Sequence, residues 1–310
     1  MQELYIKTPY IKSLELSAET GHEIFLKLEA LQPSGSFKNR GIGYLCSHNV
    51  HHEHAQSFVS SSGGNAGLAV AYAGRLLHRP VKVIVPQTTQ KLMIGKMRRE
   101  GAEVIVHGEN WNEADVLARK LATAPGCFYI PPFDHPLIWK GHATLVHEMK
   151  ESGDKPDAIV LAVGGGGLLC GVVQGLHEVG WNDVAVFTAE TEGAASFAKS
   201  VAAGKLVTLD AIRTIATSLG AKTVAEQALE WTKHHQIIPK IVSDKQALDA
   251  VVRFADQRRL FVEPACGAAL ALIYDMPQDL KAYRKIAVVV CGGSGVTLEL
   301  LEQWKAKVQS

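Results

Sequence analysis

Three glycine-rich turns are the first feature of this sequence that could do chemistry. They are Ser60-Ser61-Ser62-Gly63-Gly64-Asn65-Ala66-Gly67, Gly164-Gly165-Gly166-Gly167 and Cys291-Gly292-Gly293-Ser294-Gly295, each between a predicted strand and a predicted helix. A turn without side chains lets consecutive backbone N–H groups converge on an anion at the positive end of the following helix. Each turn is therefore a candidate anion cradle. The alternative is that the glycines only permit tight turns with positive φ.

The four consecutive glycines are the hardest to explain by turn geometry alone. Each costs up to about 1 kcal/mol of backbone entropy relative to alanine. The turn is not a nucleotide P-loop, because Leu168 and Leu169 follow it where a P-loop has lysine and then serine or threonine.

Lys38 is the candidate reactive side chain. It follows a polar turn and an aromatic residue in Pro33-Ser34-Gly35-Ser36-Phe37-Lys38-Asn39-Arg40-Gly41, at the predicted start of a helix. The dipole of a helix disfavours a cation at that end. A lysine whose pKa is lowered could form a Schiff base with an aldehyde cofactor, whereas the alternative is an ordinary solvated lysine.

Five segments together resemble a known family. The segments SGSFKNRG, SSGGNAG, GGGG, EPACGAA and VVVCGGSG occur in an order and spacing similar to those of the L-serine and L-threonine dehydratases, and most of all the L-serine dehydratase branch. These are fold type II (tryptophan synthase beta-like) pyridoxal-phosphate enzymes. The resemblance extends over essentially the whole chain. It implies a large and a small α/β domain with the cofactor in the cleft between them, in a homodimer.

The resemblance also implies roles for individual residues. It makes Lys38 the Schiff-base lysine and catalytic base, and Phe37 a residue that packs on the cofactor ring. The remaining cofactor contacts would be Asn65 to the ring hydroxyl, Cys291 to the pyridine nitrogen, and Gly164, Gly165, Gly166, Gly167 and the N–H of Leu168 to the phosphate.

Two further sites are implied by the same resemblance. The substrate carboxylate would lie on Ser62, Gly63 and Gly64, with Asn65 beside it. A monovalent cation, for which potassium is the candidate, would be held by the Glu190 carboxylate and by the carbonyl groups of Gly164, Ala194, Leu219 and Ala221.

The implied reaction is β-elimination of water from L-serine, and from L-threonine, giving pyruvate or 2-oxobutyrate and ammonia. No Asp or Glu lies between residues 286 and 298, so this strand offers no carboxylate to hold a proton on the pyridine nitrogen. Cys291 or Ser294 would leave the ring neutral, which favours prompt elimination. Gly63 stands where related racemases have a serine. It therefore disfavours racemisation and predicts open space beside the substrate, without deciding between serine and threonine.

Other interpretations remain open at this stage. A β-replacement enzyme such as a cysteine synthase would share the fold, and a weakly active homologue could bind the cofactor and regulate a partner. Glu263 could lie near the cofactor or cap the following helix. His48, His51, His52 and His54 could bind a metal, but no nearby cysteine completes a tetrahedral set, so a solvated helix end is the favoured interpretation.

The elements that must position these residues alternate along the chain. Apolar runs predict strands at 24–28, 58–61, 81–85, 104–107, 128–130, 158–163, 184–189 and 286–291. Helical periodicity predicts helices at 65–77, 90–99, 112–122, 168–178, 224–234, 245–257 and 296–305. This alternation is typical of an α/β protein. Proline-rich breaks near 31–36 and 130–136 predict a small domain over 33–135, inserted into a large domain formed by 1–32 and 136–310.

Length and charge are consistent with a two-domain enzyme. The chain has 310 residues, of which 47% are hydrophobic and 20% charged, and a net charge of +1 makes nucleic-acid binding unexpected. The five cysteines form no CxxC pair, which suits reduced thiols. No signal peptide or membrane-spanning stretch is recognised, so we expect a cytoplasmic protein whose partner is a small-molecule amino acid.

Overall fold

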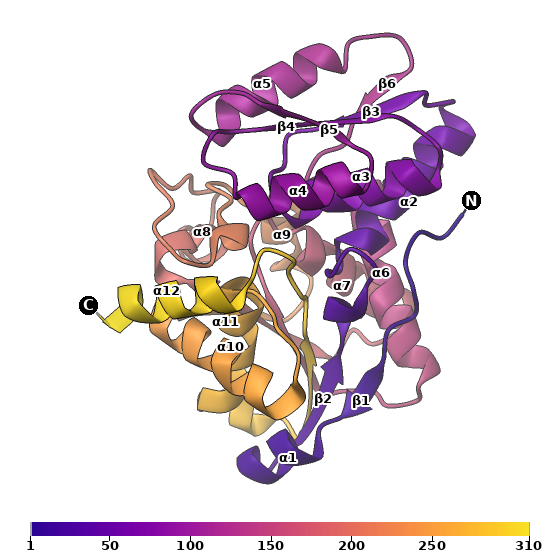
Figure 1. Cartoon of the computed structure of the whole chain (residues 1–310). Helices are drawn as coiled ribbons and strands as arrows, with labels where there is room; N and C mark the ends of the chain where they lie inside the picture. The colour runs from indigo at the N-terminus through magenta and orange to yellow at the C-terminus, as the bar shows by residue number, and fades with distance from the viewer. Residues whose placement is uncertain (1, 310) are drawn as a thin grey trace.

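The computed structural model describes residues 2–309 and contains two separate β-sheets (Figure 1). The larger sheet has the strand order β1-β2-β10-β7-β8-β9, and only β1 runs antiparallel to its neighbour. Its strands are β1 (Tyr10–Lys12), β2 (Glu23–Lys27), β7 (Ala158–Ala162), β8 (Ala185–Thr191), β9 (Ile237–Val242) and β10 (Lys285–Val289).

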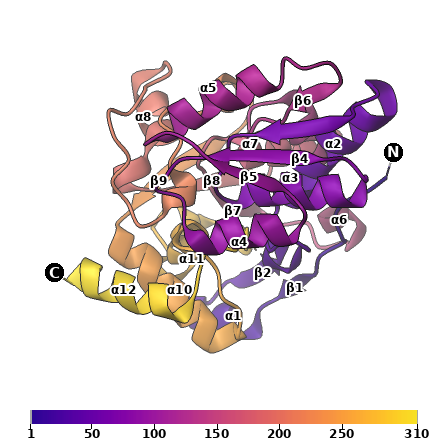
Figure 2. The ribbon, with the colours of Figure 1, turned by 45° about the horizontal axis from the view of Figure 1, so that its top comes forward.

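The smaller sheet has four parallel strands in the order β5-β4-β3-β6. They are β3 (Ser57–Ser60), β4 (Val81–Val85), β5 (Glu103–Val106) and β6 (Cys127–Tyr129). Helix α5 (Trp111–Leu121) covers one face, and α3 (Asn65–Leu76) and α4 (Lys91–Arg99) cover the other (Figure 1). Turning the top of the molecule forward brings the smaller sheet in front of the larger one (Figure 2).

The other helices surround the larger sheet or join it to the smaller one. Helix α2 (Lys38–His52) packs on both α3 and α6, and α6 packs on α7. The remaining helices are α1 (Leu14–Thr20), α6 (Pro136–Glu151), α7 (Gly167–Glu178), α8 (Ser196–Ala203), α9 (Glu226–Trp231), α10 (Asp244–Arg258), α11 (Pro264–Asp275) and α12 (Leu298–Gln309). Short 3-10 turns are η1 (Glu29–Leu31), η2 (Glu192–Ala194), η3 (Thr217–Leu219) and η4 (Leu280–Ala282).

The predicted α/β architecture is confirmed, and all eight predicted strands are present with ends shifted by at most two residues. Strands β7 and β8 are buried along their whole length, as expected for parallel strands with helices on both faces. Two strands were not predicted. Strand β9 pairs only with β8 and contains Pro239, which an edge strand tolerates, and β1 has only three residues.

Three hydrophobic clusters form the core. The largest surrounds the six-stranded sheet, a second lies between the smaller sheet and α2 and α3, and a small third lies under α5. The second cluster includes Leu4 and Ile138, which lie outside the range predicted for the small domain. The predicted domain boundaries stay a prediction, although all strands of the smaller sheet fall between residues 33 and 135.

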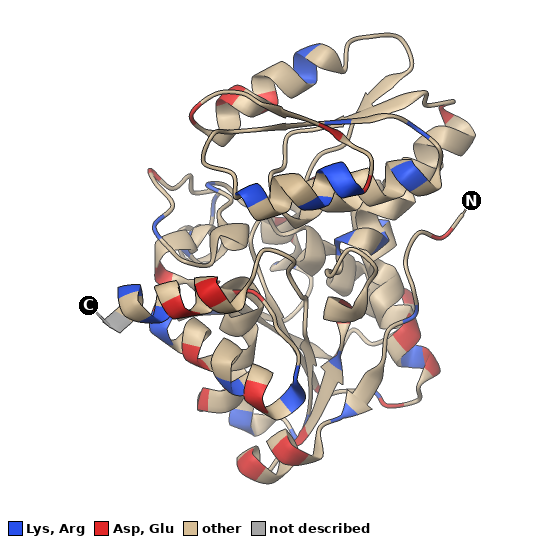
Figure 3. Ribbon diagram, in the orientation of Figure 1, with Lys and Arg blue, Asp and Glu red and all other residues tan. Residues whose placement is uncertain are grey.

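Charged residues of both signs are spread over the surface (Figure 3). Helix α4, with the sequence KLMIGKMRR, contains four basic residues and no acidic one. Among residues 2–309, no helix combines the length and apolar character needed to cross a membrane.

Candidate functional site

A cavity of about 390 Å³ lies between segments that belong to the two sheets. One wall comes from the turn after β3 and the loop after β4, and the other from η3, the start of α11 and the turn after β10. The lining residues are Gly63, Gly64, Asn65, Pro86, Thr88, Thr89, Gln90, Met93, Ile215, Thr217, Ser218, Glu263, Pro264, Gly295 and Trp304. Two of the three predicted glycine turns therefore meet at one place.

Lys38 is the first residue of α2, as the sequence predicted. Its Nζ donates a hydrogen bond to the carbonyl of Pro132 and lies 5.1 Å from the centre of the Phe37 ring. Burial lowers the pKa of the Lys38 amine to about 8, because the charged form loses its solvation, and the nearby Cys291 opposes this effect. The amine is thus much easier to deprotonate than that of a surface lysine.

The tetraglycine turn connects the end of β7 to the start of α7. Gly166 has a φ of 88°, in the left-handed region that favours glycine, and no side chain caps the helix. Within the described part of the chain, the backbone N–H groups of Gly165, Gly166, Gly167 and Leu168 donate to no protein acceptor. Four unpaired donors at the positive end of a 12-residue helix have the chemistry that a phosphate group requires.

Phe133 lies directly on this turn. A Cβ at Gly165 would approach the Phe133 ring to 2.3 Å, and a Cβ at Gly167 would approach the Phe133 carbonyl to 2.7 Å. The absence of side chains is therefore a packing requirement as well as a conformational one. These features fit a phosphorylated aldehyde bound by Lys38 and by this turn.

The turn after β3 also has poorly paired N–H groups and a position where only glycine fits. Gly63 N–H donates to no acceptor within residues 2–309, and Gly64 N–H makes a single long hydrogen bond of 3.4 Å to the Ser62 Oγ. A Cβ at Gly67 would lie 1.8 Å from the Ser62 carbonyl, so only glycine lets α3 start this close to the turn. The geometry suits the predicted binding of a carboxylate.

A buried aspartate anchors this turn and was missed by the sequence interpretation. Asp115 of α5 accepts hydrogen bonds from Ser61 Oγ at 2.7 Å and from the Tyr129 hydroxyl, while Arg119 Nε binds its other oxygen at 2.7 Å. The three hydrogen bonds lower the pKa of the Asp115 carboxyl, although burial acts in the opposite direction. The available signal was Asp115 on the face of α5 that also carries Ala114 and Ala118.

The third glycine turn is not an anion cradle, and that prediction is wrong. Three consecutive N–H groups of the turn are already used: Gly293 donates to the Gly35 carbonyl, Ser294 to Asn65 Oδ1 at 2.9 Å, and Gly295 to Glu263 Oε1 at 2.7 Å. The turn instead connects the two sheets through its hydrogen bonds.

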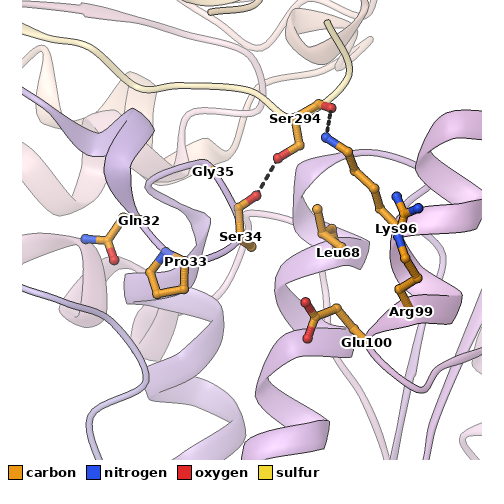
Figure 4. Close-up of a pocket in the computed structure, with 9 residues that line it drawn as sticks. All are labelled: Gln32, Pro33, Ser34, Gly35, Leu68, Lys96, Arg99, Glu100 and Ser294. Atoms are coloured by element: carbon orange, nitrogen blue, oxygen red, sulfur yellow. Dashed lines mark hydrogen bonds between the residues drawn. The ribbon is translucent and has the colours of Figure 1, made fainter. Parts of the chain in front are cut away.

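The connection continues at the outer edge of the cleft (Figure 4). Lys96 of α4 donates to the Ser294 carbonyl, and the Ser294 hydroxyl donates to the Ser34 carbonyl. These bonds border a second cavity of about 260 Å³, which Arg99 and Glu100 also line. The single proton of the Ser294 hydroxyl is therefore engaged with the Ser34 carbonyl in this structure.

Glu263 lines the cleft, and its side chain makes no capping hydrogen bond at the start of α11, so the interpretation of this carboxylate as a helix cap is wrong. Its carboxylate accepts from Asn65 Nδ2 at 3.0 Å, from Ser218 Oγ at 2.6 Å and from Gly295 N–H. Both carboxylate oxygens are therefore engaged. Asn65 is thereby held by Glu263 on one side and by Ser294 on the other.

Cys291 is buried beside the lysine segment, and its carbonyl accepts from Phe37 N–H at 3.2 Å. A hydrogen bond with Cys266 and burial raise the pKa of the Cys291 thiol well above its ordinary value. The thiol therefore stays protonated and neutral. Behind Phe37, the ring of His142 lies 4.9 Å away, and both His142 nitrogens are buried without a hydrogen-bond partner among the described residues.

Glu190 lies at the end of β8, and its carboxylate binds the start of α8. It accepts from Phe197 N–H at 2.9 Å and from Ala198 N–H at 2.7 Å. Burial raises the pKa of Glu190 to about 7, although the two N–H bonds act in the opposite direction.

The other predicted cation ligands lie on neighbouring loops. Gly164 packs on the backbone of Ser218 and Leu219, while the Leu219 carbonyl already accepts from Ala221 N–H at 2.8 Å, and Ala194 ends η2.

The histidine cluster remains without a ligand set. His48 and His52 stack with their ring centres 4.6 Å apart on α2, and His51 Nδ1 contacts the Ser47 carbonyl. Within residues 2–309, no group of three or more His, Cys, Asp or Glu side chains could hold a metal ion.

Comparison with known proteins places this geometry among cofactor-dependent enzymes. The family model described as "Pyridoxal-phosphate dependent enzyme" matches residues 1–292. A human protein named L-serine dehydratase/L-threonine deaminase is 48% identical, covering 99% of this chain and 96% of the relative.

Two solved structures share the fold. The crystal structure of a fungal L-serine ammonia-lyase from Rhizomucor miehei has a TM-score of 0.94 and 40% identity, covering 99% of both chains. The structure of maize serine racemase has a TM-score of 0.89 and 25% identity, covering 98% of this chain and 93% of that one.

Proposed function

The chain belongs to the pyridoxal-phosphate dependent enzyme family, and on that premise we propose that it is an L-serine ammonia-lyase that also accepts L-threonine. It would eliminate water from the β-carbon and release ammonia and a 2-oxo acid. The observation that carries this proposal is a buried amine at Lys38, bonded to the carbonyl of Pro132, while the next residue, Phe133, packs on the tetraglycine turn with its unpaired N–H groups.

Each part of the site has a separate task. The bound cofactor supplies an electron-accepting ring that makes the substrate's α-proton acidic. Lys38 Nζ would hold the cofactor aldehyde and, as a free amine, would remove the α-proton. The N–H groups of Gly165–Leu168 would hold the phosphate, and Phe37 would pack on the ring. The turn at Ser62, Gly63 and Gly64 would orient the substrate carboxylate, and Asn65 would bind the ring hydroxyl.

The neutral Cys291 thiol supports elimination over reactions that need a longer-lived carbanion. The Cys291 pKa is raised, and Glu263, the buried carboxylate just before α11, uses both oxygens for other bonds. Neither Cys291 nor Glu263 would therefore offer a charged group to the pyridine nitrogen. This is the structural reason for proposing a lyase.

The proposal also includes a bound cation, a homodimeric state and a cytoplasmic location. A monovalent cation, with potassium as the candidate, would bind Glu190 and the carbonyls of Gly164, Ala194, Leu219 and Ala221. A homodimer is supported by the family resemblance, and a sedimentation measurement tests it. Five free cysteines support a reducing, cytoplasmic location.

The direct test incubates the purified protein, saturated with pyridoxal phosphate, with L-serine and then with L-threonine. We expect equimolar 2-oxo acid and ammonia, as pyruvate from serine and 2-oxobutyrate from threonine. Formation of neither 2-oxo acid would refute the proposal. Cysteine formed from O-acetylserine and sulfide, without pyruvate from serine, would instead indicate a β-replacement enzyme.

The lowered pKa of Lys38 predicts how cofactor uptake depends on pH. When the pH is below the Lys38 pKa of about 8, the amine is protonated and cannot attack an aldehyde. When the pH is above that value, the amine is neutral and nucleophilic. We expect the rate of pyridoxal phosphate uptake by cofactor-free protein to rise up to about pH 8–9 and then level off, measured by stopped-flow absorbance. A rate that keeps rising towards the ordinary lysine pKa of about 10.4 would contradict the assignment.

A single methyl group in the phosphate cradle should weaken cofactor binding. In Gly165→Ala the new Cβ would overlap the Phe133 ring, so the turn must shift and its N–H groups no longer converge. We expect the dissociation constant for pyridoxal phosphate to rise at least about tenfold, measured by fluorescence titration. Gly95→Ala is the control, because a Cβ at Gly95 meets nothing within 4 Å; equal affinities of the two variants would disprove the cradle.

A further inference from the structure

Thr89 covers the position where Gly63 has no side chain. A Cβ at Gly63 would lie 2.6 Å from Thr89 Oγ1 and 2.8 Å from Thr89 Cγ2, so both ends of the branched side chain face this glycine. The expectation that Gly63 leaves open space beside the substrate is therefore wrong. A side chain from a different loop fills that space.

The loop that carries Thr89 has a hydrogen-bonded backbone, whereas the Thr89 side chain faces the cavity. Thr89 N–H donates to the Pro86 carbonyl at 3.0 Å, which closes a turn between β4 and α4. The Thr89 hydroxyl has no hydrogen-bond partner among residues 2–309, and the residue lines the 390 Å³ cavity together with Gly63, Gly64 and Asn65. Its hydroxyl and methyl groups are thus available to a ligand in that cavity.

We propose that Thr89 determines substrate specificity by limiting the room beside the substrate's β-carbon. This inference rests on the proposed function. An amino acid whose carboxylate binds the N–H groups of Gly63 and Gly64 has its β-carbon only two bonds from that carboxylate. The side chain over Gly63 is then a neighbour of the β-substituent. Threonine differs from serine by one methyl group there, and a pocket discriminates one such group by roughly 10- to 200-fold.

The test separates the methyl from the hydroxyl of Thr89. T89S removes only the methyl, and we expect it to raise kcat/KM for L-threonine relative to L-serine by about tenfold. T89V keeps the volume and removes the hydroxyl, so the threonine-to-serine ratio should stay within about twofold of the wild-type value. T88S is the matched control, because Thr88 lines the same cavity but is not among the atoms nearest a Cβ at Gly63. An unchanged ratio in T89S would overturn the proposal.

A second pair of variants tests the contact between the two residues. G63A alone would overlap Thr89, so we expect a loss of activity on both substrates, and G63A combined with T89A should recover activity on serine. No recovery in a double variant that retains the wild-type unfolding midpoint would count against a direct contact in the substrate site.

A binding measurement keeps this inference distinct from the proposed function. Trp304 lines the same cavity, so tryptophan fluorescence should be quenched when L-serine or L-threonine binds to the cofactor-loaded protein. This signal measures binding whether or not a 2-oxo acid forms. If the wild type forms no 2-oxo acid but T89S still changes the ratio of the two dissociation constants, the lyase function fails and the role of Thr89 stands. If serine is converted to pyruvate and neither ratio changes, the function stands and the role of Thr89 fails.

Discussion

Lys38→Ala should lose both the visible absorption band of the bound cofactor and all measurable 2-oxo acid production. The band requires a covalent bond between the Lys38 amine and the aldehyde, and alanine has no amine. A positioned general base typically contributes 10²- to 10⁴-fold to a rate, and Lys38 would hold the cofactor as well. We therefore expect activity on L-serine to fall by at least about 10³-fold, measured by pyruvate release.

The control for this variant is Lys140→Ala. Lys140 lies on α6, where its Nζ packs on the Tyr44 ring at 5.6 Å, outside the residues that line the cavity. It should retain the band and the rate. Normal turnover in Lys38→Ala would remove the central residue from the proposal.

The largest expected effect on stability comes from Arg40, two residues further along α2. Arg40 is fully buried, and its guanidinium donates to Glu29 at 2.7 and 2.8 Å and to Glu148 at 2.7 Å through each of two nitrogens. Lys27 is also buried, and its Nζ lies 3.9 Å from Glu29 and donates to Glu148. The cluster therefore balances two cations with two carboxylates in the protein interior.

Arg40→Ala would leave these two carboxylates with one cation between them. Removing one partner of a buried ion pair typically costs about 3–5 kcal/mol, because the remaining charge is uncompensated. We expect a loss of this size in the free energy of unfolding, measured by urea denaturation. Lys7→Ala breaks the exposed pair with Glu151 and should leave the free energy of unfolding almost unchanged, because solvent screens such a pair. Similar losses in the two variants would contradict the assigned role of the cluster.

The fold was largely predictable because its strands are short apolar runs between glycine turns. Strands β7 and β10 and helices α3 and α7 follow directly from that pattern. Strand β9 was not predictable, since its exposed positions and Pro239 make sense only once β8 is known to be its single neighbour.

The site was predictable only where local sequence determines function. Lys38 and the tetraglycine turn combine unusual composition with a helix start. Glu263 and Thr89 owe their roles to segments distant in sequence, which no periodicity reveals: Glu263 contacts Asn65 at the start of α3, and Thr89 faces Gly63 in the turn after β3. For Asp115 the helical period shows only the shared face with Ala114 and Ala118, and not the contacts with Ser61 and Tyr129. The prediction that the third glycine turn is an anion cradle was wrong for the same reason. The acceptors of its N–H groups belong to residues far away in the sequence.

The position of β10 has a consequence for how the protein is made. This strand is the last in sequence, yet it lies in the interior of the six-stranded sheet, paired with β2 on one side and β7 on the other. The smaller sheet, by contrast, comes from the continuous segment between residues 57 and 129. During synthesis the smaller sheet can form while the ribosome is still translating the rest. The larger sheet must wait for residue 289, because its two halves have no shared strand before then. The nascent chain therefore carries an unfinished sheet edge for most of its translation, and the functional site is assembled only at the end.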